Sequence, residues 1–356
     1  MRIRTTGAIA GVAALALALT ACGGGSTPTA APGTEQPATS PGAAPSGDLL
    51  SIANVVNGGL GDQGFFDDAQ RGIDALAAAG HKTETLQAAV DNPAQWKANL
   101  ESVSTGDWGL VITGTSQMVD ILAEAAPKFP DQKYIIYDSV VEAPNVASIT
   151  YKQNEGSFLA GVLAGLVTTS QADFPLAGQD KIVGAVGGMD IPVINDFFVG
   201  YEAGVKAVDP EIKVLTSYVG DFANSQKGYD QAKAMYDQGA NVVFQVAGGA
   251  GIGVLQAAKD ANKYAIGVDA NQNQLQPGHI LASMLKNIGV SLEQAVASAQ
   301  DGSLQYGTTA AFGLANDGVG LDFDDNEGIV PQTIIDKIGE YKQQVVDGTL
   351  EVPTKF

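Results

Sequence analysis

Polar and aromatic side chains follow several short apolar segments of the chain, where a bound molecule could reach them. Asn57, Asp138 and Asp269 each close an apolar run, and Phe65 and Phe197 follow loops rich in Gly, Asn and Asp. Aromatic rings stack on the flat rings of a ligand, and buried carboxylates accept short hydrogen bonds from hydroxyl groups. The alternative role for each phenylalanine is packing in the hydrophobic core. The pattern indicates a site for a small molecule with a flat part and hydroxyl groups.

A glycine-rich loop offers an enzymatic alternative. Gly59–Gly64 has the glycine spacing of a dinucleotide-binding turn between a strand and a helix. Asp62 would repel a pyrophosphate there, and no basic residue is near to offset it. Gly249–Val254 lacks the third glycine at the right place, so we expect it to let a backbone approach a ligand or a helix. We predict no nicotinamide cofactor and include Gly249 among the ligand contacts.

Other catalytic and metal-binding patterns are incomplete. His81 and His279 lie far apart, and the chain has no Gly-x-Ser-x-Gly nucleophile motif. Asp322–Glu327 begins like a calcium loop, but Glu327 stands where the turn needs glycine and Thr333 where a bidentate glutamate should be. We expect a solvated acidic loop there, no metal and no cofactor. The sequence favours a binding protein over an enzyme.

Strand-like apolar runs alternate with helical stretches, and the alternation restarts near Lys181. This order predicts an α/β fold of two lobes, each a parallel sheet with helices on both faces. Ligands of such sheets bind beyond the carboxyl ends of the strands, so facing loops should form one cleft. The predicted strands are Leu49–Asn57, Trp108–Thr113, Lys133–Tyr137, Val146–Thr150, Lys181–Val186, Ile212–Tyr218, Asn241–Val246, Tyr264–Val268 and Ile280–Met284. The predicted helices are Phe65–Ala79, Met118–Ala126, Phe158–Val167, Phe197–Val208, Gly228–Gln238, Gly253–Ala261, Val290–Ala299 and Pro331–Val346.

The N-terminal segment is typical of a secretory signal. Arg2 and Arg4 precede the apolar run Ile9–Leu19, which is too short to span a bilayer. The run ends in Leu-Thr-Ala followed by Cys22, the only cysteine of the chain, and this ending resembles a lipobox. We predict a signal peptide over residues 1–21 and a lipid on Cys22, which holds the protein on the extracytoplasmic face of the cell membrane. An ordinary signal peptide with an incidental cysteine is the alternative.

The composition separates a tether from a large folded region. Thr27–Gly47 consists of small residues and proline with one charge, Glu35, and predicts a flexible tether over residues 22–47. The chain carries 39 acidic and 19 basic residues, a formal net charge of −20. We therefore expect no nucleic-acid partner and no binding of anionic lipid through the surface. Arg71 is the only arginine beyond the signal, which favours a neutral ligand. We expect a monomer.

Six short motifs are distributed between Asn54 and Pro353. The first is the glycine-rich aspartate motif Gly58–Phe65, which contains Asp62. The others are Pro144–Val146, Asn154–Gly161, Gly187–Ile194, Gly267–Asp269 and Ser283–Lys286. Together they resemble the motifs of the basic membrane protein (BMP) lipoproteins, the purine-nucleoside-binding receptors of ABC importers.

The resemblance implies a two-lobed type I periplasmic-binding-protein fold with a nucleoside in the interlobe cleft. We expect one lobe over residues 48–155 plus 284–310 and the other over 156–283 plus 311–356. Hinge crossings are expected near Tyr151–Gly156, Leu281–Met284 and Thr308–Phe312. By position, Phe65 and Phe197 are similar to the two base-stacking rings.

The resemblance also implies roles for polar residues. Asp138 and Asp269 resemble acidic contacts to base or ribose, and Lys286 resembles a ribose contact.

Three positions depart from the family pattern. Asn57 falls near an acidic position of the family, Phe66 stands where the family often has Asn, and Asn271 stands where it often has Asp. These departures leave the preferred nucleoside open.

The resulting hypothesis is a lipid-anchored receptor that passes a nucleoside, with purines favoured, to permease and ATPase subunits. The alternatives are a sugar or other neutral ligand on the same fold, and an exported sensor or enzyme.

Overall fold

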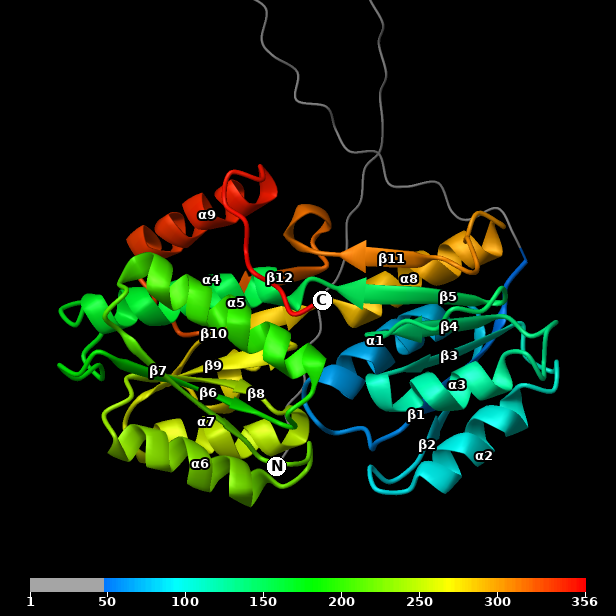
Figure 1. The fold of residues 1–356 in the computed structure, drawn as a ribbon, viewed down its shortest axis with the longest axis horizontal. Helices are drawn as coiled ribbons and strands as arrows, with labels where there is room; N and C mark the ends of the chain where they lie inside the picture. The colour runs from blue at the N-terminus through cyan, green and yellow to red at the C-terminus, as the bar shows by residue number, and fades with distance from the viewer. Residues whose placement is uncertain (1–47) are drawn as a thin grey trace, which may run out of the picture. The chain divides into compact units, whose positions relative to one another are not determined.

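Two six-stranded sheets organise the chain (Figure 1). The computed structural model describes residues 48–356, so the predicted signal peptide, Cys22 and the tether lie outside the described residues. In spatial order, the first sheet contains β11 (Thr309–Phe312), β5 (Val146–Tyr151), β4 (Tyr134–Tyr137), β3 (Leu110–Gly114), β1 (Ser51–Val56) and β2 (Lys82–Gln87). The second contains β12 (Val319–Asp322), β10 (Ile280–Lys286), β9 (Tyr264–Asp269), β8 (Val242–Val246), β6 (Ile182–Gly187) and β7 (Lys213–Tyr218).

Parallel pairing dominates both sheets, which confirms the predicted α/β class. All neighbouring strands of the first sheet run parallel. In the second sheet only β12 is antiparallel, to β10. Because parallel strands end at a common edge, the loops after β1, β3 and β4 lie together, as do those after β6, β8 and β9.

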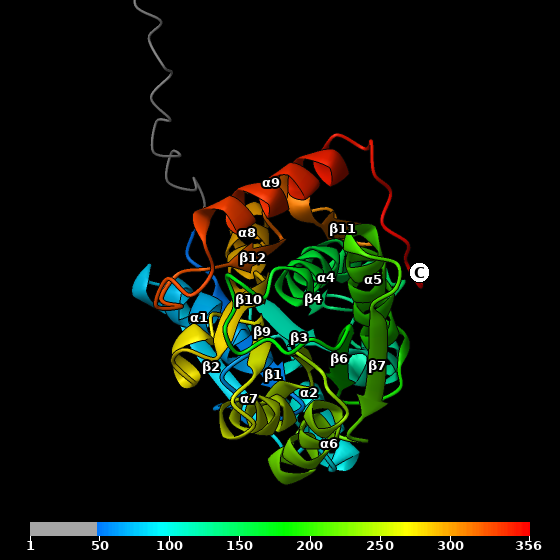
Figure 2. The same ribbon diagram turned by 90° about the vertical axis from the view of Figure 1, so that its left-hand side faces the viewer.

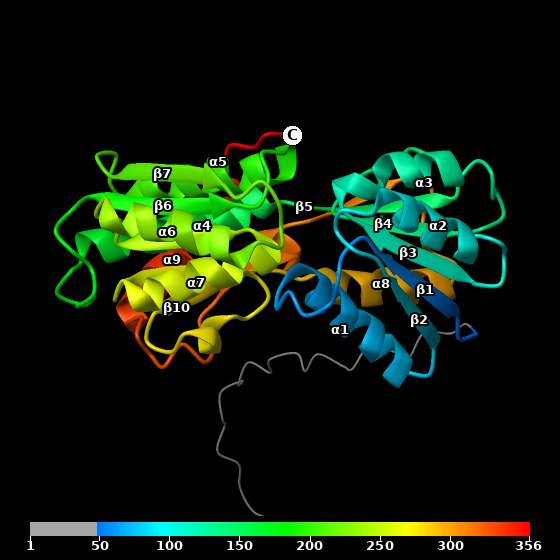
Figure 3. The same ribbon diagram turned by 90° about the horizontal axis from the view of Figure 1, so that it is seen from below.

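Helices cover both faces of each sheet (Figures 2 and 3). On the first sheet, α2 (Pro93–Val103) and α3 (Val119–Ala125) cover one face, and α1 (Phe65–Ala78) and α8 (Ile288–Gln300) the other. On the second sheet, α6 (Ser225–Asp237) and α7 (Gly251–Asp260) cover one face, and α4 (Gln153–Thr169) and α5 (Pro192–Val208) the other. Helix α9 (Gln332–Val346) packs beside α4. We refer to the two sheets with their helices as the first and second lobes; the predicted lobe boundaries remain a prediction.

Helices α4 and α5 approach each other closely because glycine lines their contact. A Cβ atom on Gly161 would lie 2.0 Å from the carbonyl oxygen of Tyr201, and one on Gly204 would lie 2.0 Å from that of Phe158. Almost all of α4 is buried, which explains why the predicted helix Phe158–Val167 is apolar on every side.

The structure also contains elements that the periodicity did not predict. Strand β2 reads Lys-Thr-Glu-Thr-Leu-Gln and lies at a sheet edge, so it lacks the apolar run of a buried strand. Helix α2 begins at Pro93 after Asn92, whose side chain caps the Gln95 amide. Strands β11 and β12 are four residues long. Helix α4 begins at Gln153, five residues before the predicted start.

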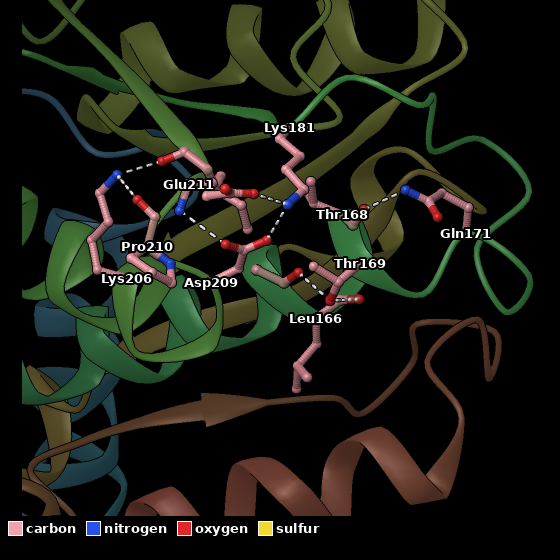
Figure 4. A network of polar contacts seen from close by, with 11 residues as sticks. Leu166, Thr168, Thr169, Gln171, Lys181, Lys206, Asp209, Pro210 and Glu211 are labelled. Atoms are coloured by element: carbon pink, nitrogen blue, oxygen red, sulfur yellow. Dashed lines mark hydrogen bonds and ion pairs between the residues drawn. The ribbon is translucent and has the colours of Figure 1, made fainter.

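A polar network ties the start of β6 to the turn between α5 and β7 (Figure 4). The Lys181 ammonium contacts the carboxylates of Asp209 at 2.8 Å and Glu211 at 2.6 Å. The Lys206 ammonium donates to the carbonyl oxygen of Pro210 at 3.0 Å. Such exposed pairs stabilise a fold only slightly, so we assign this network no functional role. Among the described residues, no helix has the length and apolar content needed to cross a membrane.

Candidate functional site

A cavity of about 590 Å³ lies where loops from the carboxyl ends of both sheets meet. It is bordered by the loops after β1, β3 and β4 of the first lobe and by α5 and the loops after β6, β7 and β8 of the second. All nine residues predicted to contact ligand line it: Asn57, Asp62, Phe65, Phe66, Asp138, Phe197, Gly249, Asp269 and Lys286. The structure thus brings together residues more than 200 positions apart in sequence.

Asp138 and Lys286 form a buried ion pair at the cavity. The Lys286 Nζ lies 2.7 Å from the Asp138 carboxylate, and the two side chains are 2% and 9% exposed. Lys286 ends β10 in the second sheet and Asp138 follows β4 in the first, so the pair joins the two sheets. Removing one partner of such a pair leaves an uncompensated buried charge, which is strongly unfavourable.

The Lys286 ammonium also lies against aromatic rings. It is 4.8 Å from the ring centroid of Phe197, 5.4 Å from that of Tyr151 and 5.8 Å from that of Phe65. Cations within about 6 Å of a ring face are attracted by its quadrupole. Phe65 and Phe197 come from helices of different lobes, so Lys286 marks where the two aromatic walls of the cavity approach each other.

Asp269 is a buried carboxyl group with a strongly shifted pKa. It closes β9 with a φ of 66°, a left-handed conformation that Asp and Asn tolerate better than other non-glycine residues. Burial raises the pKa of Asp269 to about 7, because the charged form loses its hydration, and the nearby Lys286 charge offsets only part of this effect. Asp269 therefore titrates near neutral pH.

Asp62 supports the loop that carries Phe65. Its carboxylate accepts hydrogen bonds from the backbone N–H groups of Gly64, Phe66 and Asp67 at 2.9–3.1 Å. Burial raises the pKa of Asp62, and these backbone bonds oppose the shift. Both carboxylate oxygens are thus committed within the loop, which favours a positioning role for Asp62 over direct ligand contact.

Asn57 belongs to a hydrogen-bonded corner of the first lobe. Its side-chain Nδ2 donates to Gln117 Oε1 at 3.0 Å, and its Oδ1 accepts from Thr115 Oγ1 at 3.2 Å. Thr115 has a φ of 76°, a strained conformation for a β-branched residue. Strain of this kind gathers at functional sites, and Thr115 lines the cavity.

The remaining predicted residues have packing roles as well. Phe66 lies perpendicular to Phe65 with ring centroids 5.2 Å apart, and its ring covers Gly58. Phe197 is only 2% exposed and packs on Phe244, so most of its ring belongs to the core.

Several lining residues were missed by the sequence analysis. Asp221 and Phe222 lie in the loop after β7. The Phe222 ring rests on Gly188, where an added Cβ atom would lie 2.2 Å from the ring. The sequence signal that could have found them is their position directly after the predicted strand Ile212–Tyr218, since strand ends were the expected place for ligand contacts. Val90 and Asp91 follow β2, which was not predicted.

The two histidines and Asn271 make local hydrogen bonds outside the cavity. His81 Nδ1 accepts from the Leu50 amide at 3.1 Å, and His279 Nδ1 contacts the carbonyl oxygen of Lys263 at 2.9 Å. Asn271 donates to Asp322 and to the Asp324 carbonyl instead of lining the cavity. Within residues 48–356, no group of three or more His, Cys, Asp or Glu side chains could hold a metal ion.

Comparison with known families decides the class of this protein. The family model described as "ABC transporter substrate-binding protein PnrA-like" (Bmp) matches residues 49–355. The chain belongs to this family. Membership of the BMP family is thereby confirmed, and with it the class of protein: an ABC transporter substrate-binding protein, which binds a small molecule on the extracytoplasmic side and works with permease and ATPase subunits.

Relatives are similar in sequence to this chain over most of its length. The chain is 32% identical over 330 residues to the "CD4+ T-cell-stimulating antigen" of Listeria monocytogenes, covering 86% of this chain and 88% of that protein. It is 30% identical over 329 residues to the "ABC transporter nucleoside-binding protein BmpA" of Lactococcus lactis, covering 86% and 90%.

Solved structures support the predicted type I periplasmic-binding-protein fold. Solute-binding proteins of an ABC transporter from Aeropyrum pernix superpose with a TM-score of 0.76 at 25% identity, covering 85% of this chain and 94% of the other. A solute-binding protein from Conexibacter woesei superposes with a TM-score of 0.68 at 21% identity, covering 86% and 100%, which supports the fold alone.

Proposed function

We propose that this protein binds a nucleoside, with purines favoured, and delivers it to the permease of an ABC importer. The observation that carries the proposal is the convergence of Phe65 and Phe197, from different lobes, on one cavity that also holds Asp269 and Lys286. Two rings can stack on a planar base, and an ionised carboxylate can accept hydrogen bonds from ribose hydroxyls. The volume of about 590 Å³ lies within the usual range for small-molecule sites.

The charge of the cavity supports a neutral ligand. Lys286 is the only Lys or Arg among the residues that line the cavity. Five lining residues are acidic: Asp62, Asp91, Asp138, Asp221 and Asp269. Lys286 is already paired with Asp138. A phosphate group in this cavity would meet repulsion without a free cation, which favours a nucleoside over a nucleotide.

We also propose that the protein is anchored by a lipid on Cys22. The supporting observation is the sequence Leu-Thr-Ala-Cys after a short apolar run. The tether that follows would then hold the receptor near its permease.

Calorimetric titration with adenosine, guanosine, inosine, uridine, ribose and glucose tests the ligand class. We expect nucleosides to bind and both sugars to bind much more weakly. Phe65→Leu should lower nucleoside affinity by roughly 1–3 kcal/mol, the range for one base–ring stack. Phe323→Leu, a partly buried ring outside the cavity, is the matched control and should leave binding unchanged. Tighter binding of ribose or glucose than of every nucleoside would replace this proposal with a sugar receptor.

A further inference from the structure

Gln272 has a buried side-chain amide that is bonded at both ends. The residue is 1% exposed and lies in the loop after β9. Its Oε1 accepts from the Val268 amide at 3.0 Å and from Gln245 Nε2 at 2.7 Å, while its Nε2 donates to the carbonyl oxygen of Gln63 at 2.9 Å. Because a backbone N–H only donates and a carbonyl oxygen only accepts, these contacts fix the orientation of the amide.

The bond to Gln63 connects the two lobes. Gln63 lies in the loop between β1 and α1 of the first lobe, with a left-handed φ of 54°. Asp67 holds this loop through the backbone N–H groups of Gly61 and Gln63 at 2.7 and 2.8 Å. A Cβ atom on Gly64 would lie 3.8 Å from the Cβ of Asp269, so the loop that carries Phe65 touches the end of β9.

Within the second lobe, the same amide belongs to a satisfied polar network. Gln245 is fully buried, and its Oε1 accepts from the Ala247 amide at 3.1 Å, at the start of the loop that contains Gly249. The backbone N–H of Gln272 donates to Ser283 Oγ at 2.9 Å. The network is thus anchored on three sides, and the Gln272 Nε2 extends from it to the first lobe. A rigid donor of this kind can hold the opposite loop in one position.

From this geometry we infer that Gln272 is a positioning residue for ligand binding: its bond to the Gln63 carbonyl holds the Phe65 loop against Asp269 and favours the binding-competent arrangement of the lobes. The inference rests on the proposed function only in the choice of a nucleoside for the affinity measurements; the scattering measurement on the ligand-free protein needs no ligand. Apparent affinity falls in proportion to the competent fraction, so loss of this bond weakens binding although Gln272 does not line the cavity.

The sharpest variant is Gln272→Glu in the full chain. It keeps the shape of the side chain and an acceptor for Val268 and Gln245, but its second carboxylate oxygen faces the Gln63 carbonyl. At pH 8 we expect roughly 5- to 100-fold weaker binding of the tightest nucleoside, the range for an unpaired buried polar group. We also expect a larger radius of gyration for the ligand-free protein in small-angle X-ray scattering.

Protonation should reverse the defect. A neutral carboxyl donates its O–H to the Gln63 carbonyl and remakes the bond, so the ratio of variant to wild-type Kd should fall toward one between pH 8 and pH 5. Asp269 and the groups that interact with it electrostatically, Lys286, Asp62, Asp138 and Asp68, are the same in both proteins, and the ratio removes their shared contribution.

Two further variants serve as controls. Gln272→Met removes the donor without adding charge, together with the Oε1 acceptor of Val268 and Gln245, and should weaken binding at every pH with no recovery. Gln276→Glu is the matched control, since the Gln276 Nε2 bonds to Gln256 within the second lobe, and should leave affinity and radius unchanged.

The ligand-free scattering does not depend on which ligand binds. A wild-type protein that binds no nucleoside would refute the proposed function, whereas an unchanged ligand-free radius in Gln272→Glu at pH 8 would refute the role of Gln272. Wild-type affinity of that variant at pH 8, or an equal defect at pH 5 and pH 8, would also overturn the inference.

Discussion

Asp269→Asn tests the electrostatics of the cavity through the pH dependence of stability. Burial raises the pKa of Asp269 to about 7 in the folded protein, against an ordinary value of 3.8 for an exposed Asp. The folded state therefore binds more protons than the unfolded state between these two values, and the free energy of unfolding falls as pH rises through that window. Linkage gives a loss of about 2–3 kcal/mol from this group between pH 5 and pH 8. For a folded region of about 300 residues, this is a shift in Tm of about 4 °C.

The variant isolates this group from the other carboxylates. Asn cannot ionise, has the shape of Asp and tolerates the φ of 66° at this position, whereas Ala would add backbone strain. Differential scanning calorimetry from pH 5 to pH 8 should show the Tm of the wild type falling relative to that of Asp269→Asn. Asp190→Asn, a change of an exposed carboxylate outside the cavity lining, should follow the wild type. If the wild type instead gains stability relative to Asp269→Asn as pH rises, the burial argument is wrong.

Ligand affinity should respond to pH with the opposite sign. The ionised Asp269 carboxylate accepts a stronger, charge-assisted hydrogen bond from a ribose hydroxyl than the neutral carboxyl group does, so nucleoside affinity should rise as pH passes through about 7. Titrations of Asp269→Asn should be weaker and nearly independent of pH over the same range. A pH profile of affinity that is unchanged by the substitution would contradict the proposed contact.

Three further predictions concern the ion pair, the helix packing and the anchor. Lys286→Met should lower the free energy of unfolding by about 3–5 kcal/mol in urea denaturation, because Asp138 is left buried without its partner; a loss below about 1 kcal/mol, the range of exposed pairs, would contradict this. Gly161→Ala should destabilise by at least about 1–3 kcal/mol because its Cβ would meet a carbonyl group of α5, whereas Gly339→Ala in α9, with open space around it, should be neutral or stabilising. Cys22→Ser should release the protein from membranes or leave it unprocessed in cell fractionation; normal processing with retained membrane binding would exclude the lipid anchor.

The sequence predicted the class of fold because its strands are buried. Runs such as Val111–Thr113 in β3 and Ile135–Tyr137 in β4 are covered by helices on both sides, and such strands carry a continuous apolar signal. Edge strand β2 pairs on one side only and keeps polar, partly exposed side chains, so its pattern carried no such signal. The loop that follows β2, with Val90 and Asp91 at the cavity, was missed for the same reason.

The sequence by itself also determined which residue types stand at the strand ends. Because parallel strands end at a common edge, this was enough to place Asn57 and Asp138 near each other, and the expectation that loops of the two lobes face one cleft added Asp269 from the other sheet. What it could not determine is how each charge is used. Only the tertiary structure pairs Lys286 with Asp138, turns the Asp62 carboxylate onto its own loop and leaves Asp269 buried without a direct ion pair.

The physical reason lies in the range of the forces. Apolar periodicity is a local property of the chain, and it survives in the sequence. Pairing and desolvation of charges depend on distances of a few ångströms between segments from different lobes, as with Gln272 and the Gln63 carbonyl, 209 positions apart. Such distances are set by the packing of whole sheets and helices, so they appear only once the chain has folded.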